Sequence, residues 1–195
     1  MNDRVAKLER ATAETRVELE LNLDGSGQAH IETGLGFLDH MLTALTRHAR
    51  FDLRLSCVGD RHVDDHHTAE DCALALGAAL DQALGQRRGI TRFGYAYAPL
   101  DEALARAVVD LSGRPWPEVE LGFTREKLGD IATENLRHVL QSLAIAGRLC
   151  LHVDVLRGRN DHHRAEAAFK ATALALRAAV ARDGSERVPS TKEVL

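Results

Sequence analysis

The chain of 195 residues is poor in several residue types, and each scarcity excludes a class of protein. Aromatic residues make up only 4% of it, so Leu and Ala must build an aliphatic core of helices packed on strands. Lysine and arginine (25) do not outnumber aspartate and glutamate (29). The net charge of −4 argues against a nucleic-acid partner, because neutralising phosphates needs a basic surplus. No apolar run approaches the roughly 20 residues of a membrane span.

The chain also lacks signs of export. Its charged start, MNDRVAKLERATAE, has no apolar signal core. The three cysteines, Cys57, Cys72 and Cys150, are an odd number without a C-x-x-C motif, so we expect reduced thiols in a cytoplasmic protein. Ten histidines beside two methionines and one tryptophan are the unusual feature, and they begin the functional argument.

The sequence from Asp39 resembles the sequence from Arg137, about half the chain further on. In both copies a histidine of a predicted helix, His40 or His138, precedes an Asp-His-His-x-Ala-Glu motif. Ala- and Leu-rich helical sequence follows the motif in both copies. A similarity of this length indicates an internal duplication.

Hydrophobic periodicity predicts the order strand-strand-helix-strand-helix in each half. In the first half we expect a hairpin of strands 16–22 and 28–33, a helix 37–49, a strand 51–57 and a helix 66–84, capped by Asp64 or Asp65. In the second half we expect strands 104–111 and 119–123, a helix 130–146, a strand 149–156 and a helix 161–181. The predicted segments are a first half-repeat 1–91, a second half-repeat 92–182 and a mobile C-terminal tail 183–195.

Each half carries an H-H-x-x-E motif at the start of a predicted helix. The glutamate follows the two histidines by four and three residues, which places these side chains on a shared helix face, about 5–6 Å apart at Cβ. Such a group can chelate a divalent cation. Adjacent histidines point about 100° apart around a helix, so one ion cannot easily bind both. Two metal centres are therefore favoured, with candidate ligands His40, His66, His67, Glu70, His138, His162, His163 and Glu166.

The donor types narrow the choice of ion. Imidazoles with two carboxylates and no thiolate suit Mn²⁺, Fe²⁺, Co²⁺, Ni²⁺ or Zn²⁺ rather than Ca²⁺ or Mg²⁺. Eight ligands over two octahedral ions leave positions open for a substrate. Two other interpretations are exposed histidines at capped helix starts, which the duplication disfavours, and a structural metal site that joins subunits. The four remaining histidines do not repeat and are expected at the surface or satisfied in the core: His30, His48, His62 and His152.

A set of cationic and hydroxyl side chains could clamp a phosphate through charge-assisted hydrogen bonds. Its members are Arg92, Arg114, Lys170, Ser190 and Lys192. Each alone is most simply an ordinary solvated side chain. Lys170 stands out because it lies one helical turn after Glu166, a candidate ligand. Nothing in the local pattern around Glu14, just before the first predicted strand, indicates a function.

At these residues the sequence closely resembles the imidazoleglycerol-phosphate dehydratase family of histidine biosynthesis. The matching stretches are GLGFLDHML (34–42), DDHHTAED (64–71), DLSGRP (110–115), NDHHRAEAAFKA (160–171) and PSTK (189–192). The resemblance covers essentially the whole chain. It implies a hydro-lyase with an α+β fold, in which helices lie between two four-stranded sheets of a duplicated chain. Some relatives carry a fused phosphatase domain, and this chain is expected to be monofunctional.

The resemblance also implies roles for individual residues. The eight candidate ligands would hold two Mn²⁺ per subunit, at subunit interfaces of a twenty-four-subunit shell built from trimers. The clamp residues Arg92, Arg114, Lys170, Ser190 and Lys192 would bind the substrate phosphate. Glu14 and Glu166 would transfer protons. At one position the chain differs from the family pattern, because Glu193 stands where the family usually has Gly. This difference bears on how the C-terminal tail closes over the phosphate.

The implied reaction is the metal-dependent dehydration of D-erythro-imidazole-glycerol phosphate to imidazole-acetol phosphate. Two other classes fit the histidines alone. A metallohydrolase would use a metal-bound hydroxide on an ester or amide. A non-catalytic shell assembled by metal would have saturated coordination and no phosphate pocket. The cationic set favours an enzyme over the shell, and the resemblance favours dehydration over hydrolysis.

Overall fold

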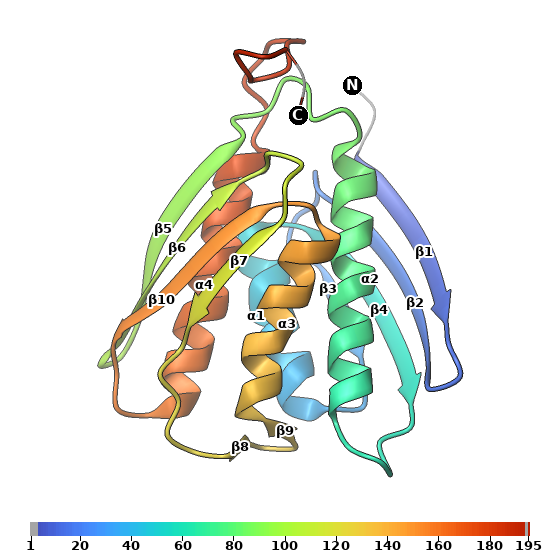
Figure 1. Ribbon diagram of the computed structural model, residues 1–195, viewed down its shortest axis with the longest axis vertical. Helices are drawn as coiled ribbons and strands as arrows, with labels where there is room; N and C mark the ends of the chain where they lie inside the picture. Colours follow the sequence, from blue (N-terminus) through green and yellow to red (C-terminus); the bar gives the residue numbers. More distant parts are fainter. Residues whose placement is uncertain (1–3, 194) are drawn as a thin grey trace.

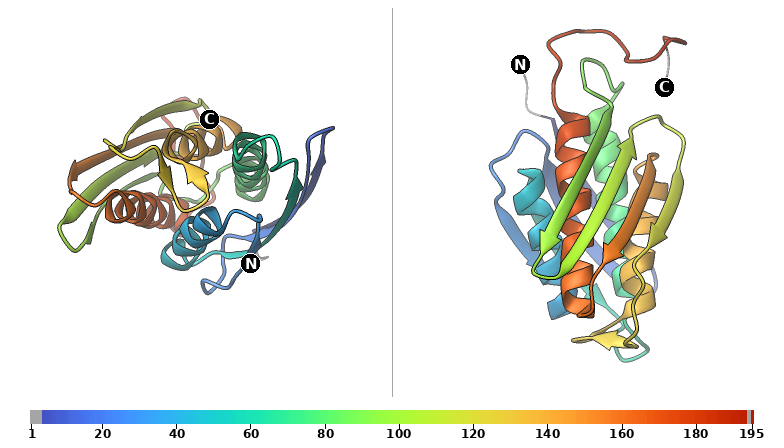
Figure 2. Two further views of the ribbon diagram at one scale, coloured as in Figure 1. Left: turned by 90° about the horizontal axis from the view of Figure 1, so that it is seen from below. Right: turned by 90° about the vertical axis from the view of Figure 1, so that its left-hand side faces the viewer.

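Four helices lie between two four-stranded sheets in the computed structural model, which describes residues 4–193 and 195. The view from below in Figure 2 shows one sheet on each side of the helices. The predicted α+β class, with helices packed between two four-stranded sheets, is therefore confirmed. The predicted boundaries of the two half-repeats and the tail remain predictions, and residues 1–3 and 194 of these segments lie outside the described residues.

The first sheet has the strand order β1-β2-β4-β3. Its strands are β1 (Val5–Ala11), β2 (Thr15–Asn22), β3 (Ala29–Glu32) and β4 (Asp52–Gly59). Along β2, alternate residues such as Val17, Leu19 and Leu21 are buried, as the period of a strand requires.

The predicted hairpin of strands 16–22 and 28–33 is wrong, because β3 pairs in parallel with β4 and not with β2. Asp52, at the start of β4, explains the difference. Its Oδ1 accepts hydrogen bonds from the backbone N–H groups of Ser26 (2.8 Å), Gly27 (3.0 Å) and Gln28 (2.9 Å). These bonds hold the segment before β3 against β4, on the side away from β2.

The second sheet repeats this topology in the order β5-β6-β10-β7, with β7 parallel to β10. Its strands are β5 (Phe93–Leu100), β6 (Ala103–Asp110), β7 (Trp116–Glu120) and β10 (Cys150–Arg157), and a short hairpin of β8 (Lys127–Leu128) and β9 (Ile131–Ala132) precedes the third helix. Strands β1 and β5, one edge strand in each half, were not predicted from the sequence. In β1 only Ala6 is buried. In β5 the small residues Gly94 and Ala98 face the core while Phe93, Tyr95 and Tyr97 are exposed, so neither strand turns large apolar side chains inward as a typical half-buried strand does.

The helices agree closely with the prediction. They are α1 (Gly36–Ala49), α2 (His66–Leu84), α3 (Thr133–Ala146) and α4 (Asp161–Val180). Helix α2 packs on α3, and α1 packs on α4, so each helix pair joins the two halves of the chain. Gly77 permits the first contact, because a Cβ there would lie 2.6 Å from the carbonyl oxygen of Leu143. The core is aliphatic, as expected, with Phe169 its largest fully buried side chain.

All four helices begin at the same end of the molecule, the lower end in Figure 1. The C-terminal tail leaves α4 at the opposite end. At the start of α2, Asp64 Oδ1 accepts from the backbone N–H of His66 (2.9 Å), and at the start of α4, Asn160 Oδ1 accepts from His162 (2.9 Å). Asn160 is the N-cap of α4, whereas in α2 the bond comes from Asp64, the residue before the N-cap Asp65. Both hydrogen bonds satisfy a backbone N–H at the start of an H-H-x-x-E helix.

Cys57 and Cys72 are buried, Cys150 is half-buried, and all three are free thiols. In the part of the chain that the structure describes, no helix has the length and apolar character needed to cross a membrane.

Candidate functional site

Two groups of side chains each bring two histidines and one glutamate together. We call His66, Glu70 and His138 the first triad, and His40, His162 and Glu166 the second triad. In each, one ligand atom from every residue lies within 4.8 Å of the others. Each triad combines the motif of one half with the helical histidine of the other half, because α2 packs on α3 and α4 on α1. Six of the eight predicted ligands thus converge within one chain.

The first triad lies at the start of α2. His138 Nε2 is 2.9 Å from Glu70 Oε1, and His66 Nε2 is 3.9 Å from Glu70 Oε2. The two imidazoles stack, with centroids 5.0 Å apart and an interplanar angle of 22°. His66 Nδ1 donates to the side-chain oxygen of buried Asn135 (2.9 Å), whose amide nitrogen donates to Asp65 (2.9 Å). This series of hydrogen bonds keeps the proton of His66 on Nδ1 and leaves the lone pair of its Nε2 facing Glu70.

The second triad lies at the start of α4. Glu166 Oε2 is 3.2 Å from His40 Nε2 and 3.3 Å from His162 Nε2. The other carboxylate oxygen, Oε1, accepts from Lys170 Nζ (2.6 Å), and the ring of Phe37 packs edge-on to His162 at 5.1 Å. Burial alone would raise the pKa of Glu166, but Lys170 and His40 outweigh it, and the pKa is lowered. Glu166 is therefore ionised at neutral pH.

The second histidine of each adjacent pair points away from the triad of its own chain. The two rings of a pair are nearly perpendicular, at 82° and 89°, with centroids 6.1 Å apart. His67 Nδ1 lies 3.1 Å from both oxygens of Asp60, and Glu14 Oε1 lies 3.7 Å from His67 Nε2. His163 Nδ1 lies 2.7 Å from Glu102 Oε2. These hydrogen bonds raise the pKa of both histidines, and the bond to His163 lowers the pKa of Glu102.

Three side chains that hold the histidines were not predicted from the sequence: Asp60, Glu102 and Asn135. They lie in loops or on the partner helix, where no local spacing relates them to the motifs. One signal was available for Glu102. It directly precedes β6, as Glu14 directly precedes β2, so the duplication places the two glutamates in corresponding turns.

Four of the five predicted phosphate ligands lie far from the triads. The backbone N–H of Arg92 donates to the carbonyl of Ala179, at the end of α4. From Glu166 to Ala179 the helix rises about 20 Å at 1.5 Å per residue. The loop after β6, which contains Arg114, reaches the same end, where Gly113 lies against Leu195.

Arg92 ties the tail to this end of the molecule. Its Nε donates to Asp110 Oδ1 (2.7 Å), and its Nη1 donates to the carbonyl of Pro189 (2.8 Å), next to Ser190. Arg114 and Lys192 are exposed. Glu193 has φ of +60°, a left-handed conformation that glycine adopts at least cost, so the departure from the usual Gly falls at a turn that favours Gly. Within one chain, only Lys170 lies beside a triad.

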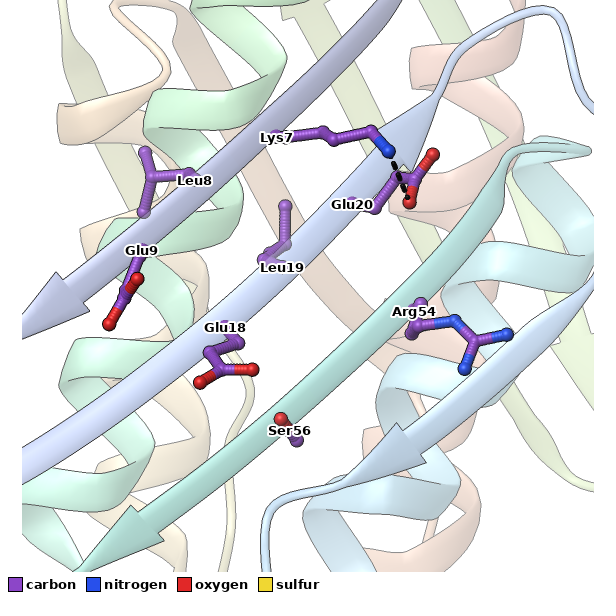
Figure 3. Close-up of a pocket in the computed structure, with 8 residues that line it drawn as sticks. All are labelled: Lys7, Leu8, Glu9, Glu18, Leu19, Glu20, Arg54 and Ser56. Atoms are coloured by element: carbon purple, nitrogen blue, oxygen red, sulfur yellow. Dashed lines mark ion pairs between the residues drawn. The ribbon is translucent and has the colours of Figure 1, made fainter.

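The remaining histidines, His30, His48, His62 and His152, are exposed, and the triads do not include them. A hollow of about 370 Å³ over the outer face of the first sheet also lies outside the triads (Figure 3). Charged side chains such as Lys7 and Glu20, paired at 3.2 Å, line it, and it contains none of the predicted site residues. Another hollow, of about 560 Å³, lies beside His163 and Glu102.

The chain was compared with known proteins. The family model for imidazoleglycerol-phosphate dehydratase matches residues 33–176. The chain is 57% identical to the imidazoleglycerol-phosphate dehydratase of Phytophthora nicotianae over 98% of its own length, but it spans only 42% of that protein. It is 53% identical to the enzyme of that name from Eremothecium gossypii, over 97% of both chains. With the one from Saccharomyces cerevisiae it shares 48% identity over 100% of both chains.

Solved structures agree with these relatives. Imidazoleglycerol-phosphate dehydratase from Staphylococcus aureus superposes with a TM-score of 0.81 at 35% identity, covering 91% of this chain and 99% of that one. The Pyrococcus furiosus protein, in complex with (S)-C348, gives a TM-score of 0.83 at 37% identity, covering 96% of this chain and 100% of that one. Sequence, fold and the paired motifs thus agree, and the chain belongs to the imidazoleglycerol-phosphate dehydratase family of hydro-lyases in histidine biosynthesis.

Proposed function

We propose that this protein uses two Mn²⁺ per subunit to dehydrate D-erythro-imidazole-glycerol phosphate to imidazole-acetol phosphate. The observation that carries the proposal is the pair of triads, each with two imidazoles and a carboxylate within 4.8 Å. Family membership supports the reaction, because the relatives are named for the dehydration of this substrate.

The residues of each triad fit a first-row divalent cation. Imidazole nitrogens with a carboxylate and no thiolate suit Mn²⁺ and its neighbours in the series. Asn135 keeps the lone pair of His66 Nε2 directed toward Glu70, as a metal ligand requires. Three protein ligands leave an octahedral ion with positions for further groups, so a triad alone does not saturate it.

The difficulty of the reaction is a C–H bond with no neighbouring carbonyl. When bound, the metal ions would stabilise negative charge on the substrate's imidazole ring by Lewis-acid polarisation. The chain itself supplies the proton-transfer groups. Glu166 is ionised and held by Lys170, and Glu14 stands 3.7 Å from His67 in an exposed turn. These two carboxylates are the candidates for removing and returning protons.

The proposal includes assembly into a homo-oligomer, a twenty-four-subunit shell built from trimers. Distance supports this assembly, because most of the predicted phosphate clamp lies about 20 Å along α4 from the triads. A small substrate cannot reach both groups in one chain, so a neighbouring copy would supply the phosphate ligands. His67 and His163 point away from their own triads and would complete those of another subunit.

The phosphate clamp in this assembly would comprise Arg92, Arg114, Lys170, Ser190 and Lys192. No nucleic-acid or membrane partner is proposed, in keeping with the net charge of −4. We place the enzyme in the cytoplasm, where the three free thiols would stay reduced.

The test replaces His67 or His163 with alanine. We expect each variant to lose turnover, bound metal and Mn²⁺-dependent assembly, because each removes one imidazole from every interface. Dehydration should be assayed with and without added Mn²⁺, alongside metal content and particle size by light scattering. His152→Ala, at an exposed histidine outside the triads, is the matched control.

Full turnover by either variant without bound metal would contradict the proposal. The other classes make different predictions for the unmodified protein. A metallohydrolase would cleave an ester or amide and leave the diol phosphate intact. A non-catalytic shell would bind metal and assemble without turning over either substrate.

A further inference from the structure

The carboxylate of Glu102, in the turn between β5 and β6, is held at both oxygens. Oε1 accepts from the backbone N–H groups of Arg159 (3.0 Å) and Asn160 (2.8 Å), just before α4. Oε2 lies 2.7 Å from Nδ1 of His163. Glu102 therefore connects the β5–β6 turn to the helix that carries the second H-H-x-x-E motif.

This contact determines which nitrogen of His163 carries the proton. An ionised carboxylate can only accept hydrogen bonds, so Nδ1 must be the donor. In a neutral imidazole the other nitrogen, Nε2, then has a free lone pair. Only that tautomer can ligate a cation through Nε2, and a carboxylate on the second nitrogen is the usual support for a ligating histidine.

The first half makes the same bond from a different position. His67 Nδ1 is held by Asp60, which directly follows β4. The corresponding residue after β10 is Gly158, which has a positive φ of 149°. A Cβ there would lie 2.8 Å from Cγ of Arg164, so a carboxylate cannot easily be placed at this position.

Glu102 in turn corresponds to Glu14, which directly precedes β2 and faces Nε2 of His67 at 3.7 Å. The two halves thus use non-equivalent residues, Asp60 and Glu102, to bind the same nitrogen of corresponding histidines. Both halves thus keep a hydrogen bond between a carboxylate and Nδ1, although the carboxylate comes from a different position in each half. This recurrence indicates that the bond itself is required. A contact inherited from the duplication without such a requirement would use the same position in both halves.

We propose that Glu102 is a positioning residue, which fixes the tautomer and direction of His163 so that Nε2 offers its lone pair to a divalent cation. Asp60 has the same task at His67. The proposal rests on the proposed function in treating these two histidines as metal ligands.

The test is Glu102→Gln in the full chain. Glutamine has one acceptor oxygen for three N–H groups. With that oxygen on the backbone N–H groups of Arg159 and Asn160, its NH₂ would face Nδ1 and force the proton of His163 onto Nε2. We expect Mn²⁺ to bind about 10–100-fold more weakly at the centre that uses His163, and normally at the other. Titration of free Mn²⁺ by electron paramagnetic resonance measures this without an activity assay.

Glu18→Gln is the charge control, because Glu18 lies on the outer face of the first sheet, away from His163. It makes the same chemical change without touching the bond to Nδ1, and unchanged Mn²⁺ binding is expected. Glu102→Asp keeps the carboxylate and should bind Mn²⁺ more tightly than Glu102→Gln. Equal weakening by Glu18→Gln and Glu102→Gln would overturn the proposal, as would unchanged binding by Glu102→Gln.

The outcomes separate this proposal from the proposed function. If the unmodified protein binds no Mn²⁺, the proposed function fails. If it binds Mn²⁺ and Glu102→Gln binds it equally well, only the role of Glu102 fails. Should Glu102→Gln not fold, a crystal structure of the unmodified protein with Mn²⁺ decides. An ion on Nε2 of His163 with Glu102 on Nδ1 supports the proposal, and an ion on Nδ1 overturns it.

Discussion

The first and second triads contain the same residue types but have different surroundings. Asn135 of α3 forms a hydrogen bond with His66 of the first triad. The corresponding residue of α1 is Phe37, whose ring packs on His162 of the second triad. The first triad is thus oriented by a buried hydrogen-bond chain and the second by an aromatic contact. A duplicated chain can change what supports a ligand group while it keeps the ligands themselves.

The triads also differ in charge. Lys170 pairs with Glu166, whereas the corresponding residue of α2 is Leu74. Among the described residues, the ion pairs of Glu70 are with His66 and His138 only. The carboxylate of the first triad therefore has no fixed cation beside it. The two triads thus share their residue types and differ in their electrostatics, and three experiments test these two properties.

The largest effects are expected when the carboxylate of a triad is removed. Glu70→Gln and Glu166→Gln should each weaken Mn²⁺ binding by at least about 100-fold at one centre, because loss of a direct ligand exceeds the usual effect of a supporting residue. Each should also abolish turnover. Mn²⁺ titration and a dehydration assay measure both effects, with Glu18→Gln on the outer face of the first sheet as the control. If either variant still bound Mn²⁺ at two centres with unchanged affinity, the glutamate replaced in it would not be a metal ligand, and the two triads would not be equivalent.

An intermediate effect is expected from the supporting residues. Asn135→Leu removes the acceptor of His66 Nδ1 and one of the two donors to Asp65 Oδ2, while the backbone N–H of Ala132 remains. Mn²⁺ should therefore bind about 10–100-fold more weakly at the first triad alone. Phe37→Leu keeps an apolar contact on His162 and should alter binding at the second triad much less. Binding isotherms of the two variants provide the measurement. Equal losses from both would show that the two supports do not differ in kind.

The smallest effect concerns Lys170 and stability. With metal removed by EDTA, Lys170→Met should lower the free energy of unfolding at pH 7 by about 0.5–1 kcal/mol, the value of a modest ion pair. The pKa of Glu166 is lower in the folded protein than its ordinary value of 4.5. The contribution is thus present above pH 4.5 and is lost as the pH falls through the folded pKa.

Urea unfolding of wild type and variant from pH 7 downward should show the difference shrinking in acid. Leu74→Met, at the matching position of α2, has no charge to lose and should show no such pH dependence. A difference between wild type and Lys170→Met that stays constant with pH would mean that packing, rather than charge, stabilises this part of α4.

Several features could be predicted because their signals are local. The caps, the helical periodicity and the H-H-x-x-E spacing lie within one helix, and α2 begins and ends where its sequence predicts. The pairing of β3 could not be predicted in this way. It depends on Asp52, more than twenty residues along the chain, which holds residues 26–28 against β4.

The family, the aliphatic helices and the histidines and glutamates that these helices carry were all predictable from the order of the residues alone. Tertiary contacts alone bring both halves into each triad, set Asn135 against His66 and Glu102 against His163, and leave most of the predicted phosphate clamp at the far end of α4. The physical reason is range. Capping and periodicity act between neighbours in the chain, whereas helix packing and strand pairing join residues that the sequence places far apart.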